Sequence, residues 1–196
     1  MNGFEKRTFA KKEQLLQAVL EIINHPSGIK ALTIQKLVDT THISRATIFK
    51  YYASKDQLLK QAFIYYLDQM NQQAHEILAQ KKDFIWTFQA LTQLKITAIH
   101  QREQQFYLDL MAFYTQKKDA TFAKAMEDYT KQAYDLMKTL FQQGRKEGAI
   151  SSKYTDEFLL LYFQCLVEGF SQPHIYQQAL AYTKEWSEVV LKGFAP

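Results

Sequence analysis

Residues 44–51 combine basic and hydroxyl side chains in one short segment, SRATIFKY. Arg45 and Lys50 are long cations that can reach base edges or phosphates. Ser44, Thr47 and Tyr51 offer hydroxyl groups to phosphate oxygens, and contacts of that kind fix the register of a protein on DNA. If this segment is the second helix of a helix-turn-helix, its N-terminal residues meet the bases in the major groove. The spacing therefore points to nucleic-acid binding.

Two short helices must position these side chains. Thr33 is the expected N-cap of a helix that runs to residue 38, and Ser44 the expected N-cap of a helix that runs to residue 51. Residues 40–43 form a tight connection, and Ile43 and Ile48 supply apolar contacts. Such a pair is too small to fold alone, so we expect helices over 9–24 and 55–79 to supply the core.

The charge of the chain is unevenly distributed. Residues 1–60 hold ten Lys or Arg against five Asp or Glu, a net charge of +5, and residues 61–196 hold fourteen against fifteen, a net charge of −1. A basic head on a neutral body favours a polyanionic partner for the head. Charge alone is equally compatible with chance clustering on a solvated surface, so the motif decides between the two.

The stretch 15–59 resembles the DNA-binding domain of the TetR family of bacterial regulators. An apolar first helix and a glycine-containing turn precede LTIQKLVDTTHIS and RATIFKYYASKDQLL. The resemblance implies that Thr47, Tyr51 and Lys55 contact phosphates, and Lys55 also begins a helix whose N-terminal dipole favours an anion. The full set of candidate DNA-binding residues is Thr33, Ser44, Arg45, Ala46, Thr47, Phe49, Lys50, Tyr51 and Lys55.

Two positions depart from the family pattern. His42 stands in the turn where the family commonly has glycine, and a non-glycine residue in a left-handed conformation has an energetic cost, although histidine tolerates it better than most. Ala46 stands where glycine is frequent, and it keeps the surface of the second helix low. Neither departure removes a group that could contact DNA.

The rest of the chain predicts further helices, over residues 83–101, 103–115, 120–143, 155–171 and 176–194. We therefore expect an all-α fold of about nine helices, with an N-terminal three-helix helix-turn-helix domain and a C-terminal helical bundle, assembled as a homodimer. Residues 1–54 would form the DNA-binding domain, and residues 55–196 the effector-binding and dimerisation domain.

The last two predicted helices are the candidates for the dimer interface. Their apolar cover is broad, as expected of helices buried between two layers, and the resemblance implies a four-helix bundle across a two-fold axis. Packing within a single chain is the alternative. The candidate interface residues are Phe158, Tyr162, Cys165, Leu166, Gly169, Trp186 and Val190.

The middle helices are rich in aromatic residues, which more often fill a core than line a pocket. Family members usually hold a small effector in this region, and ligand sites do occur between helices. We expect a small apolar or aromatic effector as partner, and the candidate pocket residues are Phe88, His100, Gln104, Tyr107, Phe113, Tyr129, Tyr162 and Glu168.

Other classes find little support in the sequence. It has no phosphate-binding glycine loop, no nucleophile elbow, no HExxH and no Glu-x-x-His pair, so we expect neither an enzyme nor a metal or cofactor site. One cysteine, no signal peptide and no long apolar run indicate a cytoplasmic protein without a membrane segment.

These observations predict a ligand-responsive transcriptional regulator, most simply a repressor. It would bind double-stranded DNA at a pseudo-palindromic operator as a homodimer and be released by a small-molecule effector. A helical adaptor, or a regulator that answers to a protein instead of a small molecule, is the alternative.

Overall fold

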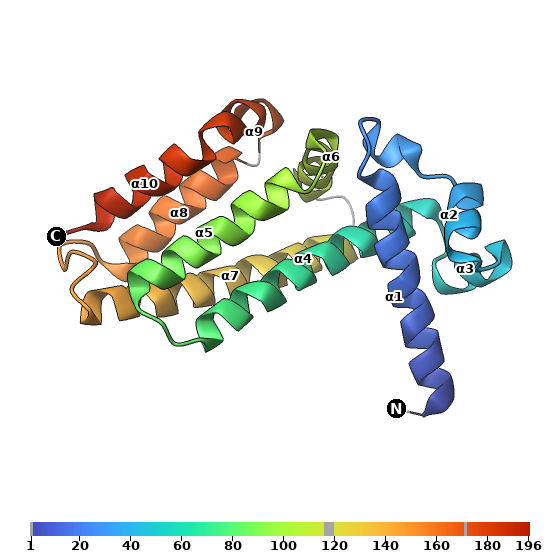
Figure 1. Cartoon of the computed structure of the whole chain (residues 1–196), viewed down its shortest axis with the longest axis horizontal. Helices are drawn as coiled ribbons and strands as arrows, with labels where there is room; N and C mark the ends of the chain where they lie inside the picture. The colour runs from blue at the N-terminus through green and yellow to red at the C-terminus, as the bar shows by residue number, and fades with distance from the viewer. Residues whose placement is uncertain (1, 116–119, 171) are drawn as a thin grey trace. The chain divides into compact units, whose positions relative to one another are not determined.

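The computed structural model describes residues 2–115, 120–170 and 172–196, and every regular element within them is helical (Figure 1). The elements, in chain order, are α1 Gly3–Ile23, the 3-10 turn η1 Gly28–Ala31, α2 Ile34–Thr41, α3 Arg45–Tyr51, α4 Lys55–Ala79, α5 Phe84–His100, α6 Gln104–Thr115, α7 Ala120–Lys146, α8 Asp156–Phe170, α9 Pro173–Ala179, the 3-10 turn η2 Leu180–Tyr182 and α10 Thr183–Phe194. The predicted all-α fold class is confirmed. None of the helices in these ranges is long and apolar enough to cross a membrane.

Several boundaries differ from those predicted, and α2 and α7 end at Thr41 and Lys146, each three residues later than expected. The first helix begins at Gly3 and not at residue 9, because Asn2 and Glu5 form a reciprocal capping box at its start. The single helix predicted over 176–194 is divided into α9, η2 and α10, and α9 begins already at Pro173. The predicted end of the helix 155–171 lies outside the described residues.

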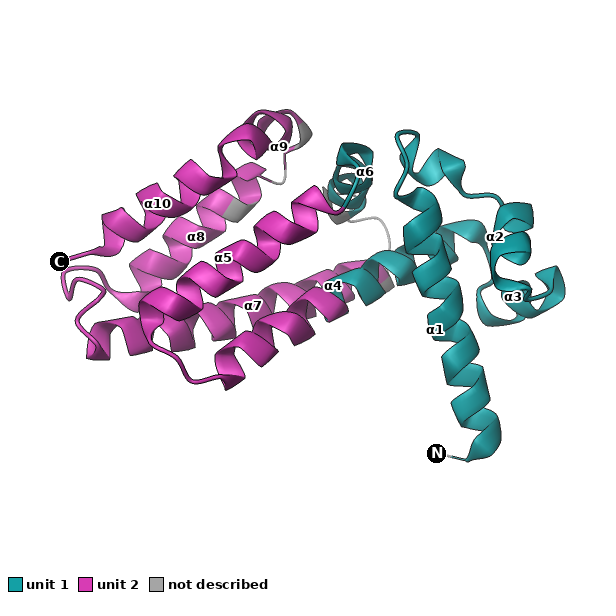
Figure 2. Cartoon of the chain, in the orientation of Figure 1, with its two compact units in different colours: residues 1–68, 102–113 teal, residues 69–101, 114–196 magenta. Residues whose placement is uncertain are grey.

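The chain forms two compact units (Figure 2). Unit 1 contains residues 1–68 and 102–113, and unit 2 contains residues 69–101 and 114–196. Helix α4 contributes to both units, and α6 belongs to the unit that contains the helix-turn-helix. These units are defined by packing, whereas the predicted division after residue 54 is one of function and stays a prediction.

Unit 1 has an apolar core to which all of its helices contribute. Its fully buried side chains come from α1, α2, α3, α4 and α6, and include Leu15, Ile23, Leu37, Ile48, Leu58, Phe63 and Phe106. The Phe63 and Phe106 rings meet edge to face at 5.7 Å between centroids, a favoured aromatic geometry. This core joins α6 to the three N-terminal helices.

Unit 2 is a bundle in which α5 packs against α7 and α10, and α7 against α8. Its core cluster consists of Phe84, Phe88, Leu140, Phe141, Ile150, Leu159, Val190 and Phe194. A largely buried ion pair of 2.6 Å joins Arg145 to Asp156, and Arg145 also donates to the Tyr154 carbonyl. These contacts fix the connection between α7 and α8.

Candidate nucleic-acid interface and ligand cavity

A tight turn sets the position of α3 relative to α2. His42 ends α2 in the left-handed conformation, with φ 56° and ψ 20°, and its N–H donates to the Val38 carbonyl at 2.8 Å. The buried Thr41 hydroxyl donates to the Leu37 carbonyl at 2.7 Å and accepts from the Ile43 N–H at 3.3 Å. The turn therefore has the geometry that glycine usually provides, with histidine in its place.

Helix α3 has one buried and one exposed face. Ile48 is buried, and Tyr52, the C-cap of the helix, is also buried, which raises the pKa of its hydroxyl to about 12. Arg45, Ala46 and Lys50 lie on the solvent side. The two cations predicted to reach DNA are thus exposed on a helix that is anchored from behind.

The N-terminus of α3 is capped by its own hydroxyl groups. The Ser44 side chain accepts from the Thr47 N–H at 3.3 Å, and the two hydroxyls lie 2.9 Å apart. Thr33 caps α2 in the same way by accepting from the Lys36 N–H at 3.0 Å. A phosphate contact by Ser44 or Thr47 would add to this pair or replace it.

Two cations at or near α3 lie over aromatic rings. The Arg45 guanidinium lies over the Phe49 ring at 5.6 Å, and the Lys12 ammonium lies over the Tyr51 ring, also at 5.6 Å. Lys55, the first residue of α4, is exposed. All nine predicted DNA-binding residues therefore belong to unit 1, at or beside α2 and α3.

Sequence reasoning missed the basic N-terminal part of α1. Lys6, Arg7, Lys11 and Lys12 are exposed along the first three turns of this helix, and Lys12 reaches the recognition helix through Tyr51. The signal was present in the sequence, since Asn2 and Glu5 have the capping-box spacing that begins a helix before residue 9.

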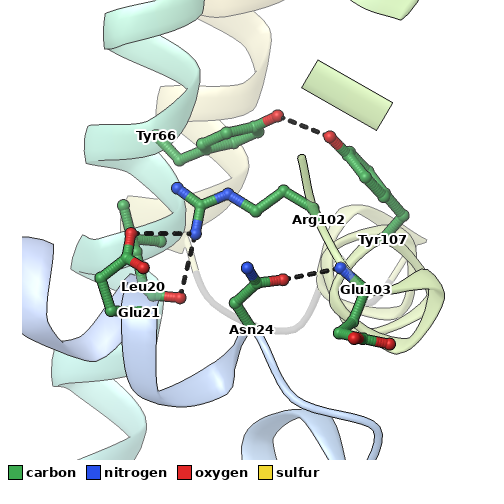
Figure 3. A network of polar contacts seen from close by, with 7 residues as sticks. All are labelled: Leu20, Glu21, Asn24, Tyr66, Arg102, Glu103 and Tyr107. Atoms are coloured by element: carbon green, nitrogen blue, oxygen red, sulfur yellow. Dashed lines mark hydrogen bonds and ion pairs between the residues drawn. The ribbon is translucent and has the colours of Figure 1, made fainter. Parts of the chain in front are cut away.

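The segment before α6 is bonded to the end of α1 (Figure 3). Arg102 Nη1 donates to the Leu20 carbonyl at 3.2 Å and to the Glu21 carboxylate at 3.3 Å. The next residue, Glu103, donates its N–H to the Asn24 side-chain oxygen at 2.6 Å. The helix-turn-helix head is thus joined to residues that directly follow α5.

Aromatic side chains surround this junction. The Arg102 guanidinium lies 5.0 Å from the centroid of Phe106 and 5.7 Å from that of Tyr66. The hydroxyls of Tyr66 and Tyr107 lie 3.0 Å apart, and burial raises the pKa of Tyr66 (Figure 3). The cation therefore lies in a mostly apolar setting, in which its hydrogen bonds are stronger than in water.

A second junction joins α6 to the turn after α1. Asp109 accepts from the Ile29 N–H at 2.7 Å, and Gln105 donates to its other carboxylate oxygen at 3.0 Å. Gly28, with φ +52°, lies so close that a Cβ at this position would collide with the Asp109 carboxylate. The glycine in the turn after α1 thus permits the close approach of α6.

Unit 2 contains a cavity of about 230 Å³ between α5 and the α8–α10 region. Of the predicted pocket residues, Phe88 lines it. Tyr107 and Phe113 belong to unit 1, where Phe113 packs on Phe63, and the remainder lie elsewhere: His100, Gln104, Tyr129, Tyr162 and Glu168. The structure therefore does not bring the predicted pocket set together.

The predicted interface residues occupy two environments. Phe158, Cys165 and Trp186 are exposed on α8 and α10, together with Leu161 and Val189, which the prediction omitted. Val190 is buried in the core of unit 2, and Tyr162, Leu166 and Gly169 are half-buried. The exposed members leave apolar side chains open to solvent on both helices.

Three comparisons relate this arrangement to known proteins. Residues 27–62 match the family model described as bacterial regulatory proteins, tetR family. A comparison with the sequences of curated proteins gives no match.

Among the described residues, no group of three or more His, Cys, Asp or Glu could hold a metal ion.

Solved structures share the fold over nearly the whole chain. A TetR-family regulator from Agrobacterium tumefaciens has a TM-score of 0.72 at 16% identity, covering 96% of this chain and 100% of its own. A TetR regulator from Haloarcula marismortui gives 0.71 at 17% identity, covering 95% and 99%. FadR from Bacillus subtilis, in complex with stearoyl-CoA, gives 0.67 at 13% identity, covering 93% and 98%.

The capped turn and the exposed basic helix form a helix-turn-helix, and the fold around it is shared with solved transcriptional regulators. Residues 27–62, within the head, match the tetR family model, and the fold of nearly the whole chain is that of solved TetR-family regulators.

Proposed function

We propose that the chain is a ligand-responsive regulator that binds a pseudo-palindromic operator as a homodimer, represses transcription and leaves the DNA when a small molecule binds unit 2. The proposal depends chiefly on one observation at α3. Arg45 and Lys50 are exposed on this helix, and its opposite face is anchored by the buried Ile48. Such a regulator acts where bacterial DNA lies, in the cytoplasm.

The apolar surface on α8 and α10 supports the homodimer. Phe158 and Leu161 are 51% and 58% exposed on α8, and Val189 is 59% exposed on α10. Large apolar side chains exposed on a surface are a feature of association sites. Two heads on one frame could contact half-sites about 34–36 Å apart, and the second contact gains from the effective concentration that the first provides.

The cavity and the junctions with α6 support the response to a ligand. Ile99 of α5 lines the cavity, and Arg102, three residues later, is bonded to the end of α1. The FadR structure with stearoyl-CoA is a case of this fold with a small molecule bound. A ligand that favours one position of α5 would thereby alter the support of the head, which is the differential contact that allosteric coupling requires.

The proposal is tested by duplex binding as a function of salt. Each phosphate contact contributes about −0.9 to the log–log slope of affinity against salt, so we expect a slope of several units and a preference for the protein's own promoter. Lys55→Ala should reduce the slope by about one unit, whereas Lys131→Ala, at an exposed position on α7, should leave it unchanged. A flat salt dependence without promoter preference would favour the adaptor alternative.

The homodimer is tested separately by light scattering. Leu161→Glu places a charge on the apolar surface of α8, so this variant should be monomeric and bind the operator weakly. Lys131→Gln, which also changes the net charge by −1, is the control and should stay dimeric. A wild-type protein that is monomeric and still binds the full operator tightly would contradict the dimer.

A further inference from the structure

One face of α5 forms a wall of the cavity in unit 2. Phe88, Thr92, Lys95 and Ile99 line it at spacings of four, three and four residues, which is the repeat of one helix face. The other walls come from the region between α8 and α10, and their larger members are Phe163, Leu166, Phe170, Tyr176, Trp186 and Val190. The cavity is therefore mainly apolar.

Lys95 is the only charged residue among the described residues that line the cavity. Two of the cavity's hydroxyls already donate to backbone carbonyls, that of Thr183 to Leu180 at 2.8 Å and that of Ser187 to Thr183 at 3.0 Å. Within the described part of the chain, Lys95 has no carboxylate partner in an ion pair. A cation without a counterion therefore remains in an apolar site.

The surroundings of Lys95 are unfavourable to its charge. Lys95 is exposed, so water still solvates part of its side chain, but the protein atoms around it partly desolvate the ammonium and lower its pKa. An isolated charge next to apolar walls is costly, and an anion that reaches the ammonium removes much of that cost. The ligand that gains most from this site has one negative charge and an apolar remainder.

We propose that the cavity binds a small amphipathic carboxylic acid, with its carboxylate on Lys95 and its hydrocarbon part between α5 and the α8–α10 region. Thr92 lies one turn before Lys95 on the same face of α5, so its hydroxyl can donate to the second carboxylate oxygen. The inference rests on the proposed function only for the role of this acid as effector, because binding itself needs no DNA.

The volume limits the size of the acid. If one non-hydrogen atom takes about 30 Å³, the share of a water molecule in the liquid, about 230 Å³ holds on the order of eight such atoms. The open side can accommodate a few more. Hexanoate and octanoate are therefore suitable probes, and an acid with a chain twice as long should gain little from its added methylenes.

Trp186 provides the assay because it lines the cavity, and the chain has only one other tryptophan, Trp86 on α5. The full chain carrying Trp86→Phe keeps Trp186 as its single tryptophan, whose emission can be excited selectively over that of the tyrosines. Titration with octanoate should shift the Trp186 emission with saturation. Octanamide, which has the same length without the charge, should bind about ten- to a hundred-fold more weakly, since a charge-assisted hydrogen bond is lost.

Variants at Lys95 test the carboxylate contact. Lys95→Met should remove the preference for octanoate over octanamide, Lys95→Arg should keep most of it, and Lys131→Met should not change it. If the protein that retains Lys95 bound octanoate, octanamide and octylamine with equal affinity, the proposal would be overturned. That comparison needs no substitution at Lys95, so it decides the matter even if Lys95→Met fails to fold.

DNA binding separates this inference from the proposed function. Binding of octanoate that depends on Lys95 but leaves operator affinity unchanged would uphold the site and refute its role as effector site. Release of the operator by a neutral compound, with no binding of octanoate, would overturn the carboxylic-acid site and leave a ligand-responsive regulator.

Discussion

Replacement of Arg102 by methionine should weaken the attachment of α6 to the helix-turn-helix head. The side chain is 17% exposed, and its guanidinium donates to the Leu20 carbonyl and to the Glu21 carboxylate beside the rings of Phe106 and Tyr66 (Figure 3). Methionine keeps most of the apolar stem and removes the charge. The change therefore measures the polar contacts of the junction.

The magnitude follows from the separate contacts. A hydrogen bond from a charged donor contributes about 1.5 kcal/mol at the lower end of its range, and a cation–aromatic contact adds about 0.5–1 kcal/mol, also at the lower end. The ion pair with Glu21 adds little, because that carboxylate side chain is 72% exposed. The Leu20 carbonyl keeps a second donor, the Asn24 N–H at 3.1 Å, so its loss is moderate. We expect Arg102→Met to cost about 2 kcal/mol.

Urea unfolding followed by circular dichroism measures this cost, and Glu21→Gln is the matched control. Removing the exposed carboxylate charge should change the free energy of unfolding by less than about 0.5 kcal/mol. The reasoning is refuted if the free energy of unfolding of Arg102→Met lies within about 0.5 kcal/mol of the wild-type value. It is also refuted if Glu21→Gln lowers the free energy of unfolding as much as Arg102→Met does. In the operator assay, Arg102→Met should also weaken the effect of any ligand that binds unit 2.

Three further predictions concern unit 1. His42→Ala should be about 1 kcal/mol less stable than His42→Gly in urea, because φ 56° favours glycine; equal stability would show that the turn relaxes. Gly28→Ala should cost about 2 kcal/mol, since its Cβ meets the Asp109 carboxylate at positive φ, and Asp109→Ala in the same chain should recover part of this loss. Burial raises the pKa of Tyr52 from 10.0 to about 12, so the unfolded chain releases this proton first and stability falls between about pH 10 and 12. Tyr52→Phe should lack that part of the alkaline loss, and parallel curves for the two proteins would contradict the assignment.

The helix-turn-helix could be predicted because its signals are local. Caps, turn residues and apolar spacing lie within a few positions of one another, and they need no knowledge of distant partners. Thr33 and Ser44 cap the two helices as expected, and His42 takes the left-handed conformation. At the start of α4, Ser54 accepts from the Gln57 N–H at 3.1 Å and the Gln57 side chain accepts from the Ala53 N–H at 2.6 Å, which is likewise a local pattern.

The role of aromatic residues in the middle of the chain could not be predicted in the same way. Phe88 and Phe106 are both buried, and both belong to helices with regularly spaced apolar residues. Phe88 nevertheless lines the cavity of unit 2, whereas Phe106 fills the core of unit 1. The difference arises from which helices meet, and a single sequence does not specify that. The same applies to Val190 and Val189, which are adjacent in the chain but buried and exposed respectively.

Lys95 illustrates what a local sequence pattern can and cannot indicate about a ligand site. It is the only residue of the Asp, Glu, Lys or Arg type within α5, FIWTFQALTQLKITAIH, and such isolation in an apolar helix could have singled it out from the sequence. A lone lysine commonly extends its ammonium into water while its stem covers apolar surface, so the signal alone does not indicate a ligand. The α8–α10 region changes that interpretation, because Phe170, Trp186 and Val190 line the same cavity as the exposed Lys95. Tertiary packing thus turns an ordinary surface lysine into the one group of the cavity with a charge still to be matched.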